Sequence, residues 1–164
     1  MSWAHIHLAL NHVPVIGLLI VLLLLAVATL RRSTELTRVS YGLLVLLAAT
    51  AVVVYLTGEP AEELIEDLPG FSEALVEEHE EVALLATIGM VVLGLVALVG
   101  LIRFRPPRIA PAWYGRGVLF LALLMGGVML WTANLGGQIR HSEIRSGSAA
   151  GTEDPASGSD RVSP

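Results

Sequence analysis

The chain has 164 residues, of which 54% are hydrophobic and only 15% are charged, and its mean hydropathy is +0.71. Soluble domains average about 45–50% apolar and about 25% charged residues, so this composition indicates a membrane protein in contact with the lipid bilayer. The net charge of -5 argues against a nucleic-acid partner. The chain contains no cysteine, which excludes disulfides, thiolate-held iron–sulfur clusters and covalent c-type haem.

Four continuous apolar runs follow one another along the chain, at residues 13–30, 41–57, 82–102 and 117–135. Each approaches the roughly 20 residues that a helix needs to cross about 30 Å of hydrocarbon. The runs are rich in Leu, Val and Ala and show no alternation, which favours helices over strands. Because the connections are short, we expect residues 1–145 to form an all-α, up-down transmembrane four-helix bundle.

The remaining parts of the chain are polar. Residues 57–81 connect the second and third runs and have helical composition over 61–68 and 72–81, with Ser72 as a candidate helix N-cap. This predicts an extracytoplasmic helical segment between the second and third spans. Residues 146–164 are rich in Ser, Gly, Ala, Asp and Pro, which is typical of a disordered tail.

The distribution of the arginines along the chain predicts how the spans are oriented in the membrane. The connections after the first and third runs together contain seven arginines, whereas residues 1–17 and 57–81 contain none. By the positive-inside rule the arginine-bearing connections face the cytoplasm. Arg140, Arg145 and Arg161 near the C-terminus oppose this assignment but are outnumbered. We therefore expect a multi-pass protein of the bacterial inner membrane, with its N- and C-termini in the periplasm.

All five histidines fall on the predicted outer side, together with ten of the fifteen acidic residues, which lie between 59 and 81. A helix rise of about 1.5 Å per residue, counted from the inner arginines, places His12 about 28 Å up and His7, His79 and His141 about 36–37 Å up. Histidines of three spans thus share nearly one level. They either cap helices and bond Glu side chains, or they form a cofactor site.

Two imidazoles from different helices can hold a b-type haem between them, and the candidate ligands are His12, His79 and His141. Arg140 is then expected to pair with the haem propionates at the outer surface. We expect Asn134 and Gln138 to face the bundle interior and contribute to the same site, because polar groups at membrane depth usually do so.

The alternative is a non-haem site for Zn, Fe or Cu, in which the three histidines act together with carboxylates. The candidate metal ligands are His12, His79, His141, Glu59, Glu63 and Glu80. His5 and His7 are two residues apart, which is too close for a helical chelating pair.

A haem at this level would exchange electrons with quinol or with a periplasmic cytochrome. The acidic residues 59–81 predict a docking face for a basic cytochrome c. A third interpretation is a structural subunit of a larger membrane complex that holds no cofactor. The sequence assigns no catalysed reaction, since it has neither a nucleophile elbow nor a phosphate-binding loop.

Four phrases carry a family resemblance: LNHVP at 10–14, TGEPAEE at 57–63, HEE at 79–81 and LGGQIRH at 135–141. They resemble small bacterial four-span membrane proteins of unknown function. More distantly, the chain is similar to a haem- or redox-associated membrane family whose first span opens with His-x-Pro and whose last ends in Gly-Gly before a His. That resemblance implies that His12 and His79 correspond to the family's first-span and third-span histidines. It also implies that Gly136, Gly137 and His141 correspond to its final Gly-Gly and His, and that the protein works in a redox setting. The acidic segment 57–81 departs from it.

Overall fold

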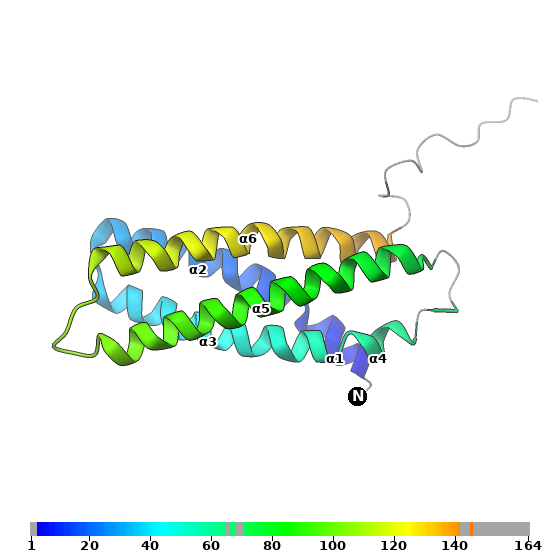
Figure 1. Ribbon diagram of the computed structural model, residues 1–164, viewed down its shortest axis with the longest axis horizontal. Coiled ribbons are helices and arrows are strands. Elements are labelled where there is room, and N and C mark those ends of the chain that lie inside the picture. Colours follow the sequence, from blue (N-terminus) through cyan, green and yellow to red (C-terminus); the bar gives the residue numbers. More distant parts are fainter. Residues whose placement is uncertain (1–2, 65, 68–70, 142–144, 146–164) are drawn as a thin grey trace, which may run out of the picture.

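The computed structural model describes residues 3–64, 66–67, 71–141 and 145, and this part of the chain contains helices and no strand (Figure 1). In chain order the helices are α1 (Trp3–Leu10), α2 (His12–Arg31), α3 (Thr34–Leu56), α4 (Glu59–Glu62), α5 (Glu73–Arg103) and α6 (Ala112–Arg140).

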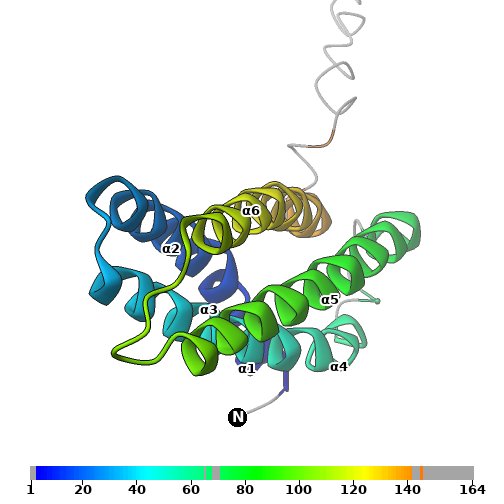
Figure 2. The same ribbon diagram turned by 60° about the vertical axis from the view of Figure 1, so that its left-hand side comes forward.

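Four stretches are long and apolar enough to cross a bilayer: α1 with α2, then α3, α5 and α6. They contain the four apolar runs of the sequence, so the predicted all-α bundle is confirmed. The helices form a ring in which α3 packs against α2 and α5, and α6 packs against α5 and α2 (Figures 1 and 2). The chain is a multi-pass membrane protein in contact with lipid.

Close packing of small residues holds the spans together. The core includes Leu18, Leu44, Met90 and Leu93, all nearly inaccessible to solvent. A Cβ on Gly94 of α5 would lie 2.5 Å from the Cβ of Ala48 on α3, so glycine lets the two backbones approach. In lipid such packing replaces the hydrophobic effect as the force between helices.

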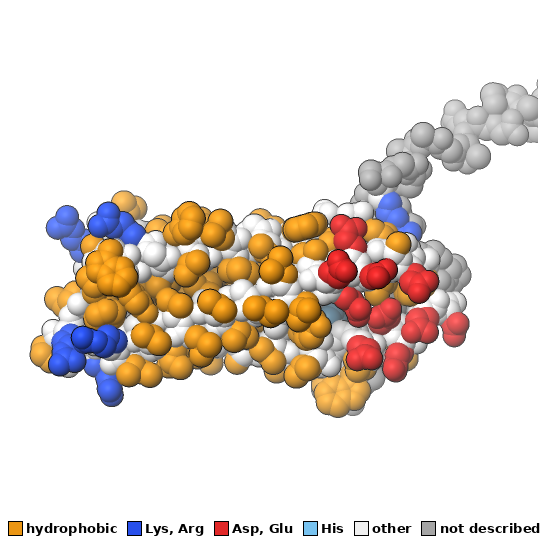
Figure 3. All heavy atoms as spheres, in the orientation of Figure 1, with side chains coloured by type: hydrophobic (Ala, Val, Ile, Leu, Met, Phe, Trp, Pro, Cys, Tyr) orange, Lys and Arg blue, Asp and Glu red, His pale blue; other side chains and the backbone are white. Residues whose placement is uncertain are grey.

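The two ends of the bundle carry opposite charge, with a band of hydrophobic side chains between them (Figure 3). The end bearing the α2–α3 and α5–α6 connections is called the arginine end. Its arginines are Arg31, Arg32, Arg38, Arg103, Arg105, Arg108 and Arg116. The opposite end, which bears the α3–α5 connection, is called the acidic end. Its carboxylates are Glu59, Glu62, Glu63, Glu66, Asp67, Glu73, Glu77, Glu78, Glu80 and Glu81.

The first span bends where α1 meets α2. Pro14 has no N–H to donate to the carbonyl of Leu10, so one helical hydrogen bond is lost there. The regular helix is interrupted at Asn11, whose backbone keeps helical angles, and α1 turns to pack against α4, α2 and α3 (Figure 1). As a result α1 lies across the acidic end.

The acidic connection contains less helix than expected. The sequence predicts a helix over 61–68, but α4 covers only Glu59–Glu62, and the described residues that follow, up to Asp67, form turns. Glutamates four residues apart, such as Glu59 and Glu63, put like charges one turn from each other. A helix this short has too few hydrogen bonds to offset that repulsion.

The second predicted helix of this connection is present, because α5 starts directly after Ser72. Ser72 stands at the N-cap position, although its side chain makes no capping hydrogen bond to any described residue. The tail predicted over 146–164 lies outside the described residues.

Candidate imidazole site at the acidic end

His79 lies near the start of α5 and is half-buried against α6. Its Nδ1 is 3.1 Å from the carbonyl oxygen of Thr132 on α6. A carbonyl only accepts, so Nδ1 carries the hydrogen, and the neutral ring keeps its lone pair on Nε2. His79 is thus a candidate ligand whose orientation is set by a neighbouring span.

Gly136 makes room for this ring. A Cβ at that position would lie 3.1 Å from Cε1 of His79. Gly136 also follows Thr132 by one helical turn, so the absence of a side chain keeps the Thr132 carbonyl within reach of the imidazole.

A second imidazole, His7 on α1, is held in the same way. Its Nδ1 lies 3.0 Å from the carbonyl oxygen of Val54 and 3.4 Å from Oγ1 of Thr57, at the end of α3. The buried Thr57 hydroxyl donates back to main-chain carbonyls of α3, which leaves it able to accept from Nδ1. The neutral His7 ring therefore also has its lone pair on Nε2.

Both rings lie at the acidic end, where His7 packs against the end of α3 and His79 packs against α6. Asn11 lies one helical turn beyond His7, and its backbone N–H donates to the His7 carbonyl at 2.8 Å. The buried Oδ1 of Asn11 accepts no hydrogen bond from the described part of the chain. The acidic end thus carries two oriented imidazoles and, one turn from His7, an amide oxygen with unused acceptor capacity among the described residues.

The other two predicted imidazoles lie on exposed positions. His12 opens α2 directly after the break in the first span, and His141 follows the last residue of α6. Among the described residues, no three His, Asp or Glu side chains are grouped so that they could hold a metal ion. His12, His79 and His141 therefore form no such three-ligand group, and the haem pairing of two of them stays a prediction.

Asn134 and Gln138 satisfy each other rather than lining an interior cavity. Asn134 is exposed, and its Oδ1 accepts a hydrogen bond from Nε2 of Gln138 at 2.7 Å. Residues four apart share one face of a helix, which explains the pair. Arg140 is the exposed last residue of α6, and the nearby Arg145 donates to the carbonyl of Gln138 at 2.9 Å.

The predicted carboxylate ligands Glu59, Glu63 and Glu80 are all exposed. Glu80 shares a side-chain hydrogen bond with Glu62 of α4. Burial, this hydrogen bond and the neighbouring carboxylates raise the pKa of Glu62 above its ordinary value. The acidic end is therefore a region of carboxylate repulsion.

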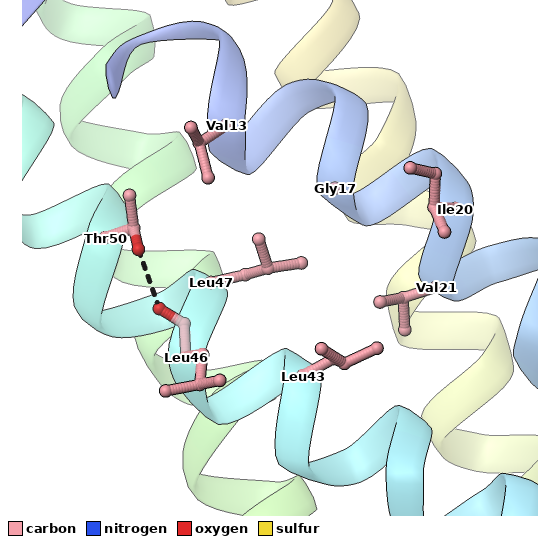
Figure 4. A pocket seen from close by; sticks show the side chains of 8 residues that line it. All are labelled: Val13, Gly17, Ile20, Val21, Leu43, Leu46, Leu47 and Thr50. Carbon is pink, nitrogen blue, oxygen red and sulfur yellow. Dashed lines mark hydrogen bonds between the residues drawn. The ribbon is translucent and has the colours of Figure 1, made fainter. Parts of the chain in front are cut away.

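A shallow groove of about 300 Å³ lies between α2 and α3, and none of its lining residues is a histidine (Figure 4). Its lining is aliphatic, with Val13, Gly17, Leu43 and Leu47 among the contributing residues. The one hydroxyl on its wall, that of Thr50, donates to the carbonyl of Leu46. The groove thus offers shape for an acyl chain but no polar group that would orient a reacting molecule.

Sequence reasoning overlooked His7 because its spacing from His5 is wrong for a helical pair. Two signals pointed to it nevertheless. Counted from Arg31 and Arg103, His7 and His79 stand at the same level, about 36 Å up. His7 and Asn11 are also four residues apart, which places both on one helix face.

Comparison of the chain with protein-family models, with curated proteins and with solved structures gives no match. The resemblance drawn from the sequence phrases therefore stays a prediction, and the function has to be argued from the geometry of the acidic end.

Proposed function

We propose that the chain is an inner-membrane cofactor protein that binds a b-type haem at its acidic end and transfers single electrons there. The observation that carries the proposal is the position of His79. It is held between two spans, with its Nδ1–H donated to the carbonyl of Thr132 and the lone pair on Nε2. Ligating histidines in metal and haem sites are typically oriented by a hydrogen bond of this kind.

Of the candidate cofactors, haem needs the fewest ligands from the protein. The porphyrin supplies four of the six iron ligands, so the protein needs to add only one or two imidazoles. Zinc and non-haem iron sites require about three or four protein ligands. The described residues offer no group of that size, so the non-haem alternative has less support from their geometry.

The proposed orientation places the haem on the periplasmic side. Seven arginines lie at one end of the bundle and ten carboxylates at the other, and arginine-rich connections face the cytoplasm. Trp3 and the end of α6 lie at the acidic end, so both described ends of the chain are on that side (Figure 1).

The electron partner that suits this end is a basic, one-electron carrier such as a periplasmic c-type cytochrome, with membrane quinol as the alternative. The carboxylates near the site would attract a basic protein by electrostatic steering. Electron transfer to a basic cytochrome c should therefore slow steeply as salt is raised, whereas transfer from a neutral quinol should not.

An absorption spectrum tests the function directly. Protein purified from membranes of haem-replete cells should show a Soret band that shifts on reduction with dithionite. His79→Ala should remove most of that band, while Gln138→Ala, a control on the neighbouring helix, should keep it. A wild-type protein that carries bound metal and no Soret band would refute the haem proposal and favour the non-haem alternative.

A further inference from the structure

The arginine end of the bundle carries positive charge that almost no opposite charge balances (Figure 3). Residues 31–40 and 103–116, which include both connections of this end, contain seven arginines and one carboxylate, Glu35. Within the described residues, three of these arginines donate to main-chain carbonyls and none pairs with a carboxylate. We propose that this end binds anionic phospholipid of the surrounding bilayer through the lipid phosphate. The proposal does not depend on the haem site at the other end.

Two of the arginines are positioned so that their phosphate-binding atoms stay free. Nε of Arg105 donates to the carbonyl of Ile102 at 3.1 Å, and Nε of Arg116 donates to the carbonyl of Ala112 at 3.2 Å. Both side chains are exposed, and their Nη groups donate to no atom of the described residues. A guanidinium group is a planar fork whose N–H groups can bind two phosphate oxygens at once. Each of these arginines therefore keeps its Nη1–Nη2 edge available for a phosphate.

Arg32 occupies a backbone position that favours glycine. It is the C-cap residue of α2, with a φ of 52° and a ψ of 36°. Helices commonly end with glycine in this left-handed conformation, because a Cβ is disfavoured there. The backbone N–H of Arg32 closes the helix by donating to the carbonyls of Ala28 and Thr29, which needs no side chain. The exposed guanidinium group makes no hydrogen bond to the described fold, so its presence here favours a partner outside the chain.

Exposed hydrophobic side chains among the arginines indicate that this partner is a lipid. Leu30, which precedes Arg31, is 84% exposed, and Ile109, which follows Arg108, is 73% exposed. Trp113 near the start of α6 is 69% exposed. Aliphatic and tryptophan side chains beside basic residues are typical of segments that lie at the boundary between headgroups and acyl chains. A free anion or an acidic protein in water would leave these side chains exposed, whereas a phospholipid supplies both phosphate and hydrocarbon.

The test compares phospholipids that differ in headgroup charge. The full chain in neutral detergent is mixed with phosphatidylglycerol or with phosphatidylcholine, and bound lipid is counted by native mass spectrometry. Wild type should retain phosphatidylglycerol in preference to phosphatidylcholine, and phosphatidylglycerol should raise its melting temperature. Inorganic phosphate, which has no acyl chain, should not. Salt at about 1 M should weaken the binding, because it screens exposed charges.

Arg32→Gly separates lipid binding from folding. Glycine adopts the left-handed backbone freely, so in neutral detergent the variant should melt at the wild-type temperature or above it. Its affinity for phosphatidylglycerol should fall about fivefold, which is the contribution of one arginine at an anionic membrane surface. Arg108→Gln in the other connection should lower the affinity to a similar extent. Arg140→Gln removes the same charge at the acidic end and should leave phosphatidylglycerol binding unchanged.

Four results would overturn the proposal. The first is equal retention of phosphatidylglycerol and phosphatidylcholine by wild type. The second is an unchanged affinity in both Arg32→Gly and Arg108→Gln, since binding would then not involve the arginine end. A lower melting temperature of Arg32→Gly in neutral detergent would show that Arg32 serves the fold instead. A response to inorganic phosphate as large as that to phosphatidylglycerol would assign the arginines to a free anion.

Discussion

The arginine end and the acidic end of the bundle use polar side chains in different ways. At the arginine end several polar groups are bonded to the main chain: the Tyr114 hydroxyl donates to Val96, Ser40 donates to Leu36 at 2.8 Å, and Arg38 donates to Phe104 at 3.5 Å. At the acidic end the imidazoles of His7 and His79 use only one nitrogen in this way.

The arginine end is also held by packed aromatic rings. Tyr114 stacks near Tyr41, Phe104 and Trp113, with ring centroids 6.3, 5.1 and 5.6 Å away. This aromatic cluster anchors the arginine end, and the Tyr41 hydroxyl within it has no hydrogen-bond partner among the described residues. At the acidic end each of the two imidazoles keeps a lone pair on Nε2, and the carboxylates of α4 and of the first turns of α5 repel one another.

The largest expected effect comes from crowding the aromatic cluster. A Cβ on Gly100 would lie 2.6 Å from Cε2 of Tyr41 and 2.9 Å from Cε1 of Tyr114. These rings are rigid, so Gly100→Ala should lower the free energy of unfolding by about 1–3 kcal/mol. Thermal aggregation in detergent measures this loss as a lower melting temperature of the variant. Gly42→Ala, with no described atom within 4 Å of its Cβ position, is the control, and equal melting temperatures would contradict the cluster's role.

The N-caps of α3 and α5, which lie at opposite ends of the bundle, also differ. At the arginine end Ser33 caps α3 by accepting from the N–H of Leu36 at 3.3 Å, whereas Ser72 at the acidic end makes no such bond within the described chain. Ser33→Ala should therefore cost about 1 kcal/mol, and Ser72→Ala clearly less. Denaturant titration followed by circular dichroism compares them. A larger loss in Ser72→Ala would break the contrast.

The two tyrosines of the aromatic cluster, buried Tyr41 and half-buried Tyr114, predict different effects. Tyr114→Phe removes a hydrogen bond and should cost about 0.5–1.5 kcal/mol. The buried hydroxyl of Tyr41 has no partner among the described residues, so Tyr41→Phe should be neutral or stabilising. Parallel melts of the two variants measure the difference. Destabilisation of both to the same extent would show that the Tyr41 hydroxyl is paired in the membrane.

The smallest expected effect concerns Glu62, whose raised pKa follows from burial, the hydrogen bond with Glu80 and nearby carboxylates. A carboxyl group with a pKa above its unfolded value stabilises the fold when protonated, so its contribution is lost as pH rises above about 4.5 through the folded pKa. Glu62→Gln should therefore raise the free energy of unfolding at neutral pH. The gain should be less than about 0.5 kcal/mol, because solvent screens the charges. Hydrogen exchange in α4 at several pH values would measure it.

High salt provides the control for Glu62→Gln. Since salt screens carboxylate repulsion, the difference between variant and wild type should shrink at about 1 M ionic strength. A difference that is independent of both pH and salt would mean that the substitution acts through packing rather than charge.

The sequence by itself determined the four spans, the charge difference between the ends and the side on which the histidines collect, because runs of apolar residues and their flanking charges are local properties. The pairing of His79 with Thr132, the self-satisfied Asn134–Gln138 pair and the arrival of His7 at the site were decided only by the tertiary structure. They depend on how the first span bends at Asn11 and on which helix faces meet, and both are set by packing between segments distant in the chain.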